Sequence, residues 1–377
     1  MPVVLGAMLA VSFARTVRQA TKKSRRAGQG MPPPCAVVGA EATPGDAGSL
    51  SGRWSAVHAR AKWKVGKWTA FAGKKQLAAL DMRLSKLLTG SLRSTQVLGG
   101  KGEWLFYKSP EDGDSIADYV GESRFDRRLL DDTLDALGEL DQKLRRQGVP
   151  FCLLVAPNKE NVYPEYMPDK IVRVSSESRT DVMMQYLLDR AGFPVAYPKK
   201  ALMDGKRHAQ LYYTMDTHWN ILGGYIGVQS VMEAIGQKPV PLEAREIVRN
   251  GPPHKNDLVR MAKASSMYTA TFSPDWSIMG LPPAKRTGKD FWDYSHNENP
   301  AATSEKSILI VGDSFKTSTR SSFLERFRHV HDVHMDRCDD LQKLIAKTKP
   351  DLVLLEFVER HAGLIAATAR RLAKGLD

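Results

Sequence analysis

Three short runs of almost continuously apolar residues constrain the fold more than any other feature of the sequence. They are Phe151–Ala156 (FCLLVA), Ile308–Val311 (ILIV) and Leu352–Phe357 (LVLLEF). A strand with one solvated face alternates apolar and polar residues, so nearly continuous apolar runs of this length indicate strands that are buried on both faces. Stretches with helical spacing separate these runs along the chain, which is typical of a mostly parallel sheet. We therefore predict an α/β fold in which helices cover both faces of one central sheet.

The charge and composition divide the chain at about residue 60. Residues 1–75 hold 13 Lys and Arg but only two acids, and therefore carry +11 of the net charge of +13. Residues 27–52 are rich in Gly, Pro, Ala and Ser, which is typical of a flexible linker. We expect 1–60 to be a signal-like basic arm with a linker, and 61–377 to form the folded domain. Because residues 76–377 carry only the remaining +2 of the net charge, we predict no nucleic-acid partner.

Two further segments bear on localisation and on the shape of the domain. Val3–Ala14 is a 12-residue apolar run, which is short for a membrane span and fits the core of a signal peptide. Basic residues follow this run instead of preceding it, and beside a membrane anchor they would favour the cytoplasmic side. Both interpretations stay open at this point. Residues 238–306 contain eight prolines and are expected to form an irregular insertion at the edge of the sheet.

A first candidate site follows the ILIV run, where the sequence continues Gly312-Asp313-Ser314. Ligands of open parallel sheets bind at the carboxyl ends of the strands, so the hydroxyl of Ser314 would be exposed at the binding edge. Backbone N–H groups of the same turn could face a developing oxyanion. Asp and Ser after a strand are also good N-cap residues of a helix, so this tripeptide alone does not establish a nucleophile.

A second candidate site is the segment Tyr213–Asn220 (YTMDTHWN), which precedes a helical stretch that ends near Ile235. A serine nucleophile needs a general base, and imidazole suits this role because it titrates near neutral pH. A carboxylate can fix the imidazole tautomer and stabilise the imidazolium. Asp216 and His218 are two residues apart, so one turn could present both. A capping aspartate and a surface histidine would fit the same short pattern.

Taken together, the two segments resemble the SGNH-hydrolase-like domain of the AlgX/AlgJ family of alginate O-acetyltransferases. In this family, as here, the Asp and His block precedes the Ser block, whereas the Ser block comes first in ordinary SGNH esterases. Other blocks resemble the family in the same order: Gly100–Tyr107 (GKGEWLFY), Ala156–Glu165 (APNKENVYPE), Asn256–Leu258 (NDL) and Leu352–Arg360 (LVLLEFVER). The resemblance covers about residues 95–365. Since the sequence ends at Asp377, we expect no C-terminal carbohydrate-binding module and a closer likeness to AlgJ than to AlgX.

The resemblance implies a three-layer α/β/α domain and an O-acetyltransferase that moves acetyl groups to hydroxyls of an exopolysaccharide in the periplasm. It implies Ser314 as the nucleophile, His218 as the base and Asp216 as the orienting acid. It also implies a membrane acyltransferase partner as the source of acetyl groups, in place of a bound cofactor. Two alternatives stay open, namely a carbohydrate esterase with the same triad and a non-catalytic polysaccharide-binding scaffold. The intact triad argues against the scaffold.

Three further residues are candidates for substrate contact. Trp219 could stack on a sugar ring or could pack as a wall of the site. Lys159 and Tyr163 follow the FCLLVA run and should also lie near the carboxyl edge, where either substrate contact or a structural role is expected. The sequence contains no Walker loop, Rossmann glycine pattern or zinc-finger spacing, and His329, His331 and His334 fit strand histidines better than a metal site. We predict no cofactor and no metal.

Overall fold

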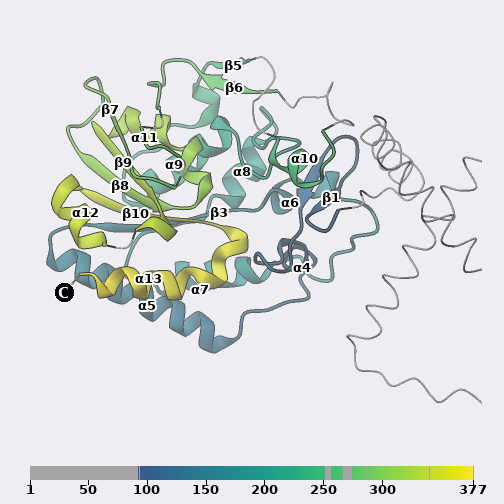
Figure 1. Ribbon diagram of the computed structural model, residues 1–377, viewed down its shortest axis with the longest axis horizontal. Coiled ribbons are helices and arrows are strands. Elements are labelled where there is room, and N and C mark those ends of the chain that lie inside the picture. The colour runs from purple at the N-terminus through teal and green to yellow at the C-terminus, as the bar shows by residue number, and fades with distance from the viewer. Residues whose placement is uncertain are drawn as a thin grey trace, which may run out of the picture. The chain divides into compact units, whose positions relative to one another are not determined.

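The central sheet of this computed structural model has six strands in the order β4-β3-β10-β8-β9-β7 (Figure 1). Their bounds are β3 Phe151–Ala156, β4 Val195–Ala196, β7 Ser295–Glu298, β8 Ser307–Gly312, β9 His329–His334 and β10 Leu352–Val358. All neighbouring strands are parallel except β7 and β9, which are antiparallel. This topology confirms the mostly parallel sheet that the apolar runs predict.

The structure describes residues 92, 94–250, 256–265, 274–285, 287–290, 292–338 and 340–376. All of them belong to one compact unit, Ala70–Asp377. The expected basic arm, its linker and the apolar run Val3–Ala14 lie outside the described residues. Among the helices that are described, none combines the length and the apolar character needed to cross a membrane.

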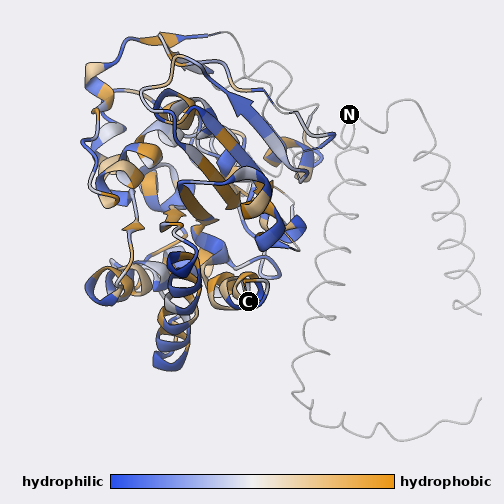
Figure 2. Ribbon diagram, turned by 90° about the vertical axis from the view of Figure 1, so that its left-hand side faces the viewer, coloured by the Kyte–Doolittle hydropathy of each residue, from blue (hydrophilic) through white to orange (hydrophobic). Residues whose placement is uncertain are grey.

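The core lies on both faces of the sheet, because every residue of β3, β8 and β10 is buried. Successive side chains of a strand point to opposite faces, so each strand contributes to two separate clusters. Leu153, Leu309 and Val353 belong to one cluster, whereas Cys152 and Ile308 belong to the other. The strands therefore need a cover on each side, and Figure 2 shows their hydrophobic residues enclosed between helices.

One face is covered by α5 Arg127–Arg146, α7 Arg179–Arg190, α12 Leu341–Thr348 and α13 Ile365–Lys374. The other face is covered mainly by α9 Ile221–Ala234 and α11 Arg320–Arg326 (Figure 1). In α5 buried residues recur every three to four positions, and most of them are leucine or alanine, which gives the helix one apolar face. The helix begins at Arg127 because the carboxylate of Asp126 accepts a hydrogen bond from the backbone N–H of Leu129.

The remaining elements frame the carboxyl edge of the sheet and its surroundings. The strands are β1 Val97–Gly99, β2 Leu105–Tyr107, β5 Ile247–Arg249 and β6 Trp276–Ile278, and the helices are α4 Ser115–Val120, α6 Lys159–Val162, α8 Lys199–Gly205 and α10 Asp257–Met261. Short 3-10 turns are η1 Pro164–Tyr166, η2 Leu242–Ala244, η3 Ser314–Ser318, η4 Met335–Arg337 and η5 Glu359–Leu364. The described parts of the segment 238–306 contain the two-stranded β5–β6 sheet, α10 and the edge strand β7.

Candidate active site

Ser314 lies at the carboxyl end of β8, at the first residue of the 3-10 turn η3. The turn is fixed by Asp313, whose carboxylate accepts hydrogen bonds from the backbone N–H groups of Phe315 (2.9 Å) and Val358 (2.7 Å). Gly312 is needed at the preceding position, because a Cβ there would lie 2.9 Å from the Cβ of Glu356 in the adjacent strand. Asp313 therefore does act as a cap, and the cap presents the serine.

His218 lies between Ser314 and Asp216. The Oγ of Ser314 donates to Nε2 of His218 at 2.7 Å, and Nδ1 of His218 donates to Oδ1 of Asp216 at 2.6 Å. Asp216 is buried and His218 is partly exposed, so the acid is screened from water while the base reaches the site. The structure thus brings together all three residues that the sequence pattern proposes, in the order of a serine–histidine–acid triad.

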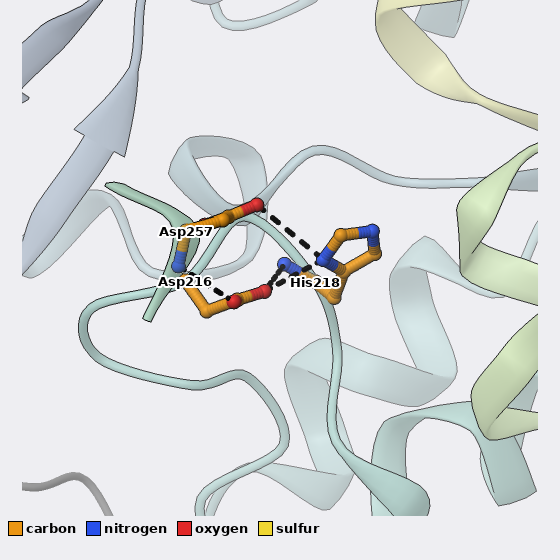
Figure 3. A group of neighbouring side chains, drawn as sticks. All are labelled: Asp216, His218 and Asp257. Atoms are coloured by element: carbon orange, nitrogen blue, oxygen red, sulfur yellow. Dashed lines mark hydrogen bonds and ion pairs between the residues drawn. The ribbon is translucent and has the colours of Figure 1, made fainter. Parts of the chain in front are cut away.

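A second carboxylate, Asp257 at the start of α10, lies beside Asp216 and His218 and supports the loop that carries them (Figure 3). Its Oδ1 accepts from the backbone N–H of Thr217 at 2.8 Å, and its Oδ2 accepts from the Thr217 hydroxyl at 2.5 Å. Its own backbone N–H donates to Oδ2 of Asp216 at 2.9 Å. Burial and the nearby charge of Asp216 raise the pKa of Asp257. Sequence reasoning gave Asp257 no role, although the NDL block contained the signal.

Asp216, His218 and Asp257 are also the one group of potential metal ligands found in the described part of the chain, with ligand atoms within 4.8 Å of one another. Each carboxylate oxygen of this group already accepts a hydrogen bond from an N–H or O–H group. The Nδ1 of His218 is engaged by Asp216. This hydrogen-bonded arrangement favours a catalytic dyad, formed by Asp216 and His218, over a metal centre.

Lys159 is buried beneath the loop that carries the dyad. Its ammonium donates to the carbonyl oxygens of Tyr213 (3.0 Å), Thr214 (3.2 Å) and Asp216 (2.7 Å). Burial lowers the pKa of Lys159 to about 8, although the charges of Asp257 and Asp216 oppose this shift. The contacts favour a structural role for Lys159 over direct contact with a substrate.

Tyr163 and Trp219 are also buried, at 4% and 0% exposure. The hydroxyl of Tyr163 accepts from the backbone N–H of Leu211 at 2.8 Å, and the indole N–H of Trp219 donates to the carbonyl oxygen of Phe315 at 3.0 Å. Sugar stacking requires an exposed ring face, which Trp219 does not offer. Of the two interpretations of Trp219, the structure favours the packed wall.

A cavity of about 430 Å³ opens over the triad. Its wall includes Tyr107, Asp112, Arg260, Met261, Thr317 and Arg360. The Tyr107 hydroxyl donates to Oδ2 of Asp112 at 2.8 Å, and Nε of Arg360 lies 3.4 Å from the same oxygen. A larger cavity of about 570 Å³ lies beside Pro150 and Leu352, at the amino ends of the strands, and contains no member of the triad. We therefore place the site in the smaller cavity.

Comparison with known proteins decides the family. Residues 97–331 match the model of a family described as SGNH hydrolase-like domain, acetyltransferase AlgX. The match covers more than half of the 377 residues and includes Asp216, His218 and Ser314. The chain belongs to this family. It is an O-acetyltransferase of the SGNH-hydrolase-like type, and the resemblance drawn from the sequence blocks is confirmed.

Individual relatives agree with this assignment to the AlgX family. The chain is 23% identical over 328 residues to the "Probable alginate O-acetylase AlgJ" of Pseudomonas syringae pv. tomato, covering 78% of each protein. It is 22% identical over 286 residues to the protein of the same name from Pseudomonas putida, covering 70% of each. The structure of Bacillus cereus PatB1 with a sulfonyl adduct matches with a TM-score of 0.50 at 17% identity, covering 70% of this chain and 96% of that one. The last match supports the fold.

Proposed function

We propose that this acetyltransferase works through an acetyl ester on Ser314, with His218 as general base and Asp216 as the acid that orients it. The observation that carries the proposal is the continuous line of hydrogen bonds from Ser314 through His218 to Asp216, at 2.7 and 2.6 Å. A serine hydroxyl is a weak nucleophile at neutral pH, and this line supplies the base that it needs.

In the first half-reaction, the Oγ of Ser314 attacks the acetyl carbonyl carbon of the donor while His218 takes the hydroxyl proton. The imidazolium, stabilised by Asp216, then gives this proton to the leaving group, and acetyl-Ser314 remains. Backbone N–H groups near Ser314 would hold the oxyanion. In the second half-reaction, an acceptor hydroxyl loses its proton to His218 and attacks the ester, and the proton returns to Ser314 as the acetyl group leaves.

We propose an exopolysaccharide as the acceptor. Two curated relatives are named as alginate O-acetylases, and the cavity over Ser314 is lined by the hydrogen-bonding and charged groups of Tyr107, Arg260 and Arg360. In the same scheme, a membrane acyltransferase partner supplies the acetyl groups and the reaction takes place in the periplasm. A reporter fused to the C-terminus should report an extracytoplasmic location, and a cytoplasmic signal would contradict this part of the proposal.

The triad is tested by Ser314→Ala. We expect acetyl-ester turnover to fall by about 10⁴–10⁶-fold, because loss of a triad member commonly costs this much. The fold should be retained, since Ser314 is only partly buried. Ser277→Ala in β6, outside the cavity wall, is the matched control and should keep the rate of the unmodified chain. Retained turnover in a folded Ser314→Ala protein would exclude Ser314 as the nucleophile.

A further inference from the structure

A second histidine, His361 in η5, lies between two carboxylates beside the proposed triad. Its Nε2 is 2.9 Å from Oδ1 of Asp112, and its Nδ1 is 3.3 Å from Oδ2 of Asp313. The side chain of His361 is 15% exposed, and that of Asp313 is 3% exposed. This Asp–His–Asp array is separate from the line of hydrogen bonds through His218.

The two partners dictate the protonation state of His361. An ionised carboxylate only accepts hydrogen bonds, so both ring nitrogens of His361 must donate. A neutral imidazole would turn a lone pair toward either Asp112 or Asp313. The geometry therefore selects the imidazolium, which carries a proton on each nitrogen.

The surrounding charges act in both directions on this imidazolium. Burial lowers the pKa of His361 and the charge of Arg360 acts in the same sense, but the hydrogen bonds to Asp112 and Asp313 raise the pKa above its ordinary value overall. Burial opposes the ionisation of Asp313, but the hydrogen bond and charge of His361 bring its pKa down to about 2. His334 also lies close enough to interact with the charges of Asp313 and His361. Its own pKa is lowered to about 4, mainly by burial and to a smaller extent by the charge of Lys316.

The two carboxylates belong to different parts of the site. Asp313 precedes Ser314 and caps its turn through the backbone N–H groups of Phe315 and Val358. Asp112 lies in the cavity wall, where it accepts from the Tyr107 hydroxyl. His361 therefore joins the turn of the nucleophile to the wall of the cavity.

We propose that His361 in its doubly protonated form is a positioning residue. It holds the turn that carries Ser314 and the part of the cavity wall formed by Asp112 in the relative positions that acyl transfer requires. This inference rests on the proposed function of Ser314. When His361 loses a proton, one of its two hydrogen bonds is lost, and the turn or the wall is released. Activity should then fall as the pH rises through the pKa of His361, and it should also fall at low pH, where the general base of the triad cannot accept the serine proton.

Protonation of His361 also makes the free energy of unfolding depend on pH, in a direction that follows from its raised pKa. Because folding raises the pKa of His361, its contribution to the free energy of unfolding is fully present below the pKa of the unfolded chain. It is lost as the pH rises through the pKa of the folded protein. Loosening of the turn and loss of this contribution should therefore occur over the same alkaline range.

The protonation state is tested directly by ¹⁵N NMR of the imidazole groups in the full chain, with His361→Gln to assign the signal. We expect both ring nitrogens of His361 to carry protons at pH 7. Asp112→Asn should lower the pKa of His361 by about one unit or more, since a nearby opposite charge commonly shifts a pKa by roughly 1–3 units. A neutral tautomer of His361 at pH 7, or a pKa of His361 that is unchanged in Asp112→Asn, would overturn the proposal.

The effect on catalysis is tested by the pH profile of kcat/KM. Asp112→Asn should move the alkaline limb to lower pH and leave the acid limb in place. His208→Gln, at an exposed histidine that pairs with Glu243, is the matched control and should move neither limb. An alkaline limb that stays in place in Asp112→Asn would show that His361 does not set it. Active Ser314→Ala protein would instead refute the proposed function, while the NMR titration would still decide the state of His361.

Discussion

The ammonium group of Lys159 illustrates how a buried charge can serve a site that it does not touch. It donates to three backbone carbonyls of residues 213–216, and its position is 3% exposed. Bonds to a charged donor are stronger than neutral ones, so this single side chain fixes the path of the loop before His218. We infer that the orientation of Asp216 depends on it.

Replacement of Lys159 by methionine should therefore impair both stability and activity. The side chain keeps a similar length but loses the three hydrogen bonds that its ammonium donates. We expect the free energy of unfolding to fall by about 2 kcal/mol, because hydrogen bonds to a charged group contribute roughly 1.5–3 kcal/mol. Denaturant unfolding and turnover of an acetyl ester are the measurements.

Lys200→Met supplies the control for this experiment. Lys200 is 91% exposed and pairs with Asp204 one helical turn away, so its loss should change the free energy of unfolding by less than about 0.5 kcal/mol. Equal stability of the Lys159 and Lys200 variants would show that the carbonyl contacts of Lys159 contribute little.

Among the elements, α9 and η3 approach each other more closely than side chains would allow. A Cβ at Gly224 of α9 would lie 2.4 Å from the carbonyl oxygen of Ser318, and a Cβ at Gly227 would lie 2.8 Å from the ring of Trp219. Glycine at position 224 lets the helix pack directly on the turn that begins at Ser314, and glycine at position 227 leaves space for the ring of Trp219. Helix α9 thus packs against η3 and supports the position of the turn that begins at Ser314.

Gly224→Ala should push α9 away from η3. We expect a loss of about 1–3 kcal/mol in the free energy of unfolding, as for other overpacked sites, together with reduced turnover. The control is Gly138→Ala in α5, where no atom lies within 4 Å of the added Cβ. Because alanine favours a helix more than glycine does, this control should gain up to about 1 kcal/mol. If Gly224→Ala were as stable and active as the control, the close packing would have no functional consequence.

For the molecule as a whole, several buried acids determine how stability depends on pH. Burial raises the pKa of Glu160 to about 7, and it also raises the pKa values of Asp118, Glu356 and Glu359. These four acids therefore bind more protons in the folded protein than in the unfolded chain at pH values above the ordinary carboxyl range. Burial lowers the pKa values of His331 and His334 to about 4, which acts in the opposite sense below about pH 6.5. The contribution of the four acids to the free energy of unfolding should fall as the pH rises from about 5 to 8.

This prediction is checked by denaturant unfolding at several pH values across that range. Glu160→Gln should flatten the slope, because an amide cannot lose the proton that burial keeps on Glu160. Its matched control is Glu165→Gln, at a half-exposed glutamate that pairs with Lys206 on the surface. A pH dependence of stability that is the same in Glu160→Gln and Glu165→Gln would contradict the assignment of a protonated Glu160 to the core.

Features of the fold and the site can be predicted from the sequence where they depend on a short stretch of residues, and not where they depend on contacts between distant residues. The FCLLVA run coincides with β3 because burial on both faces leaves its mark on every residue of the strand. Ser314, Asp216 and His218 could be proposed from short motifs. The pairing of Asp112 with His361 joins residues 249 positions apart, and only the fold brings them together. The NDL block marks Asp257 in the sequence, but its role depends on where α10 packs against the loop of Asp216 and His218.

The central claim is that Ser314 carries the acetyl group, and intact-mass analysis tests it most directly. The full chain is incubated with an activated acetyl ester, and the modified residue is located by peptide mapping. We predict one added acetyl group on Ser314, none in Ser314→Ala, and discharge of the acetyl group to an added oligosaccharide faster than to water. Discharge to water alone would favour the esterase alternative. An acetyl group found elsewhere, or undiminished labelling of Ser314→Ala, would contradict the account.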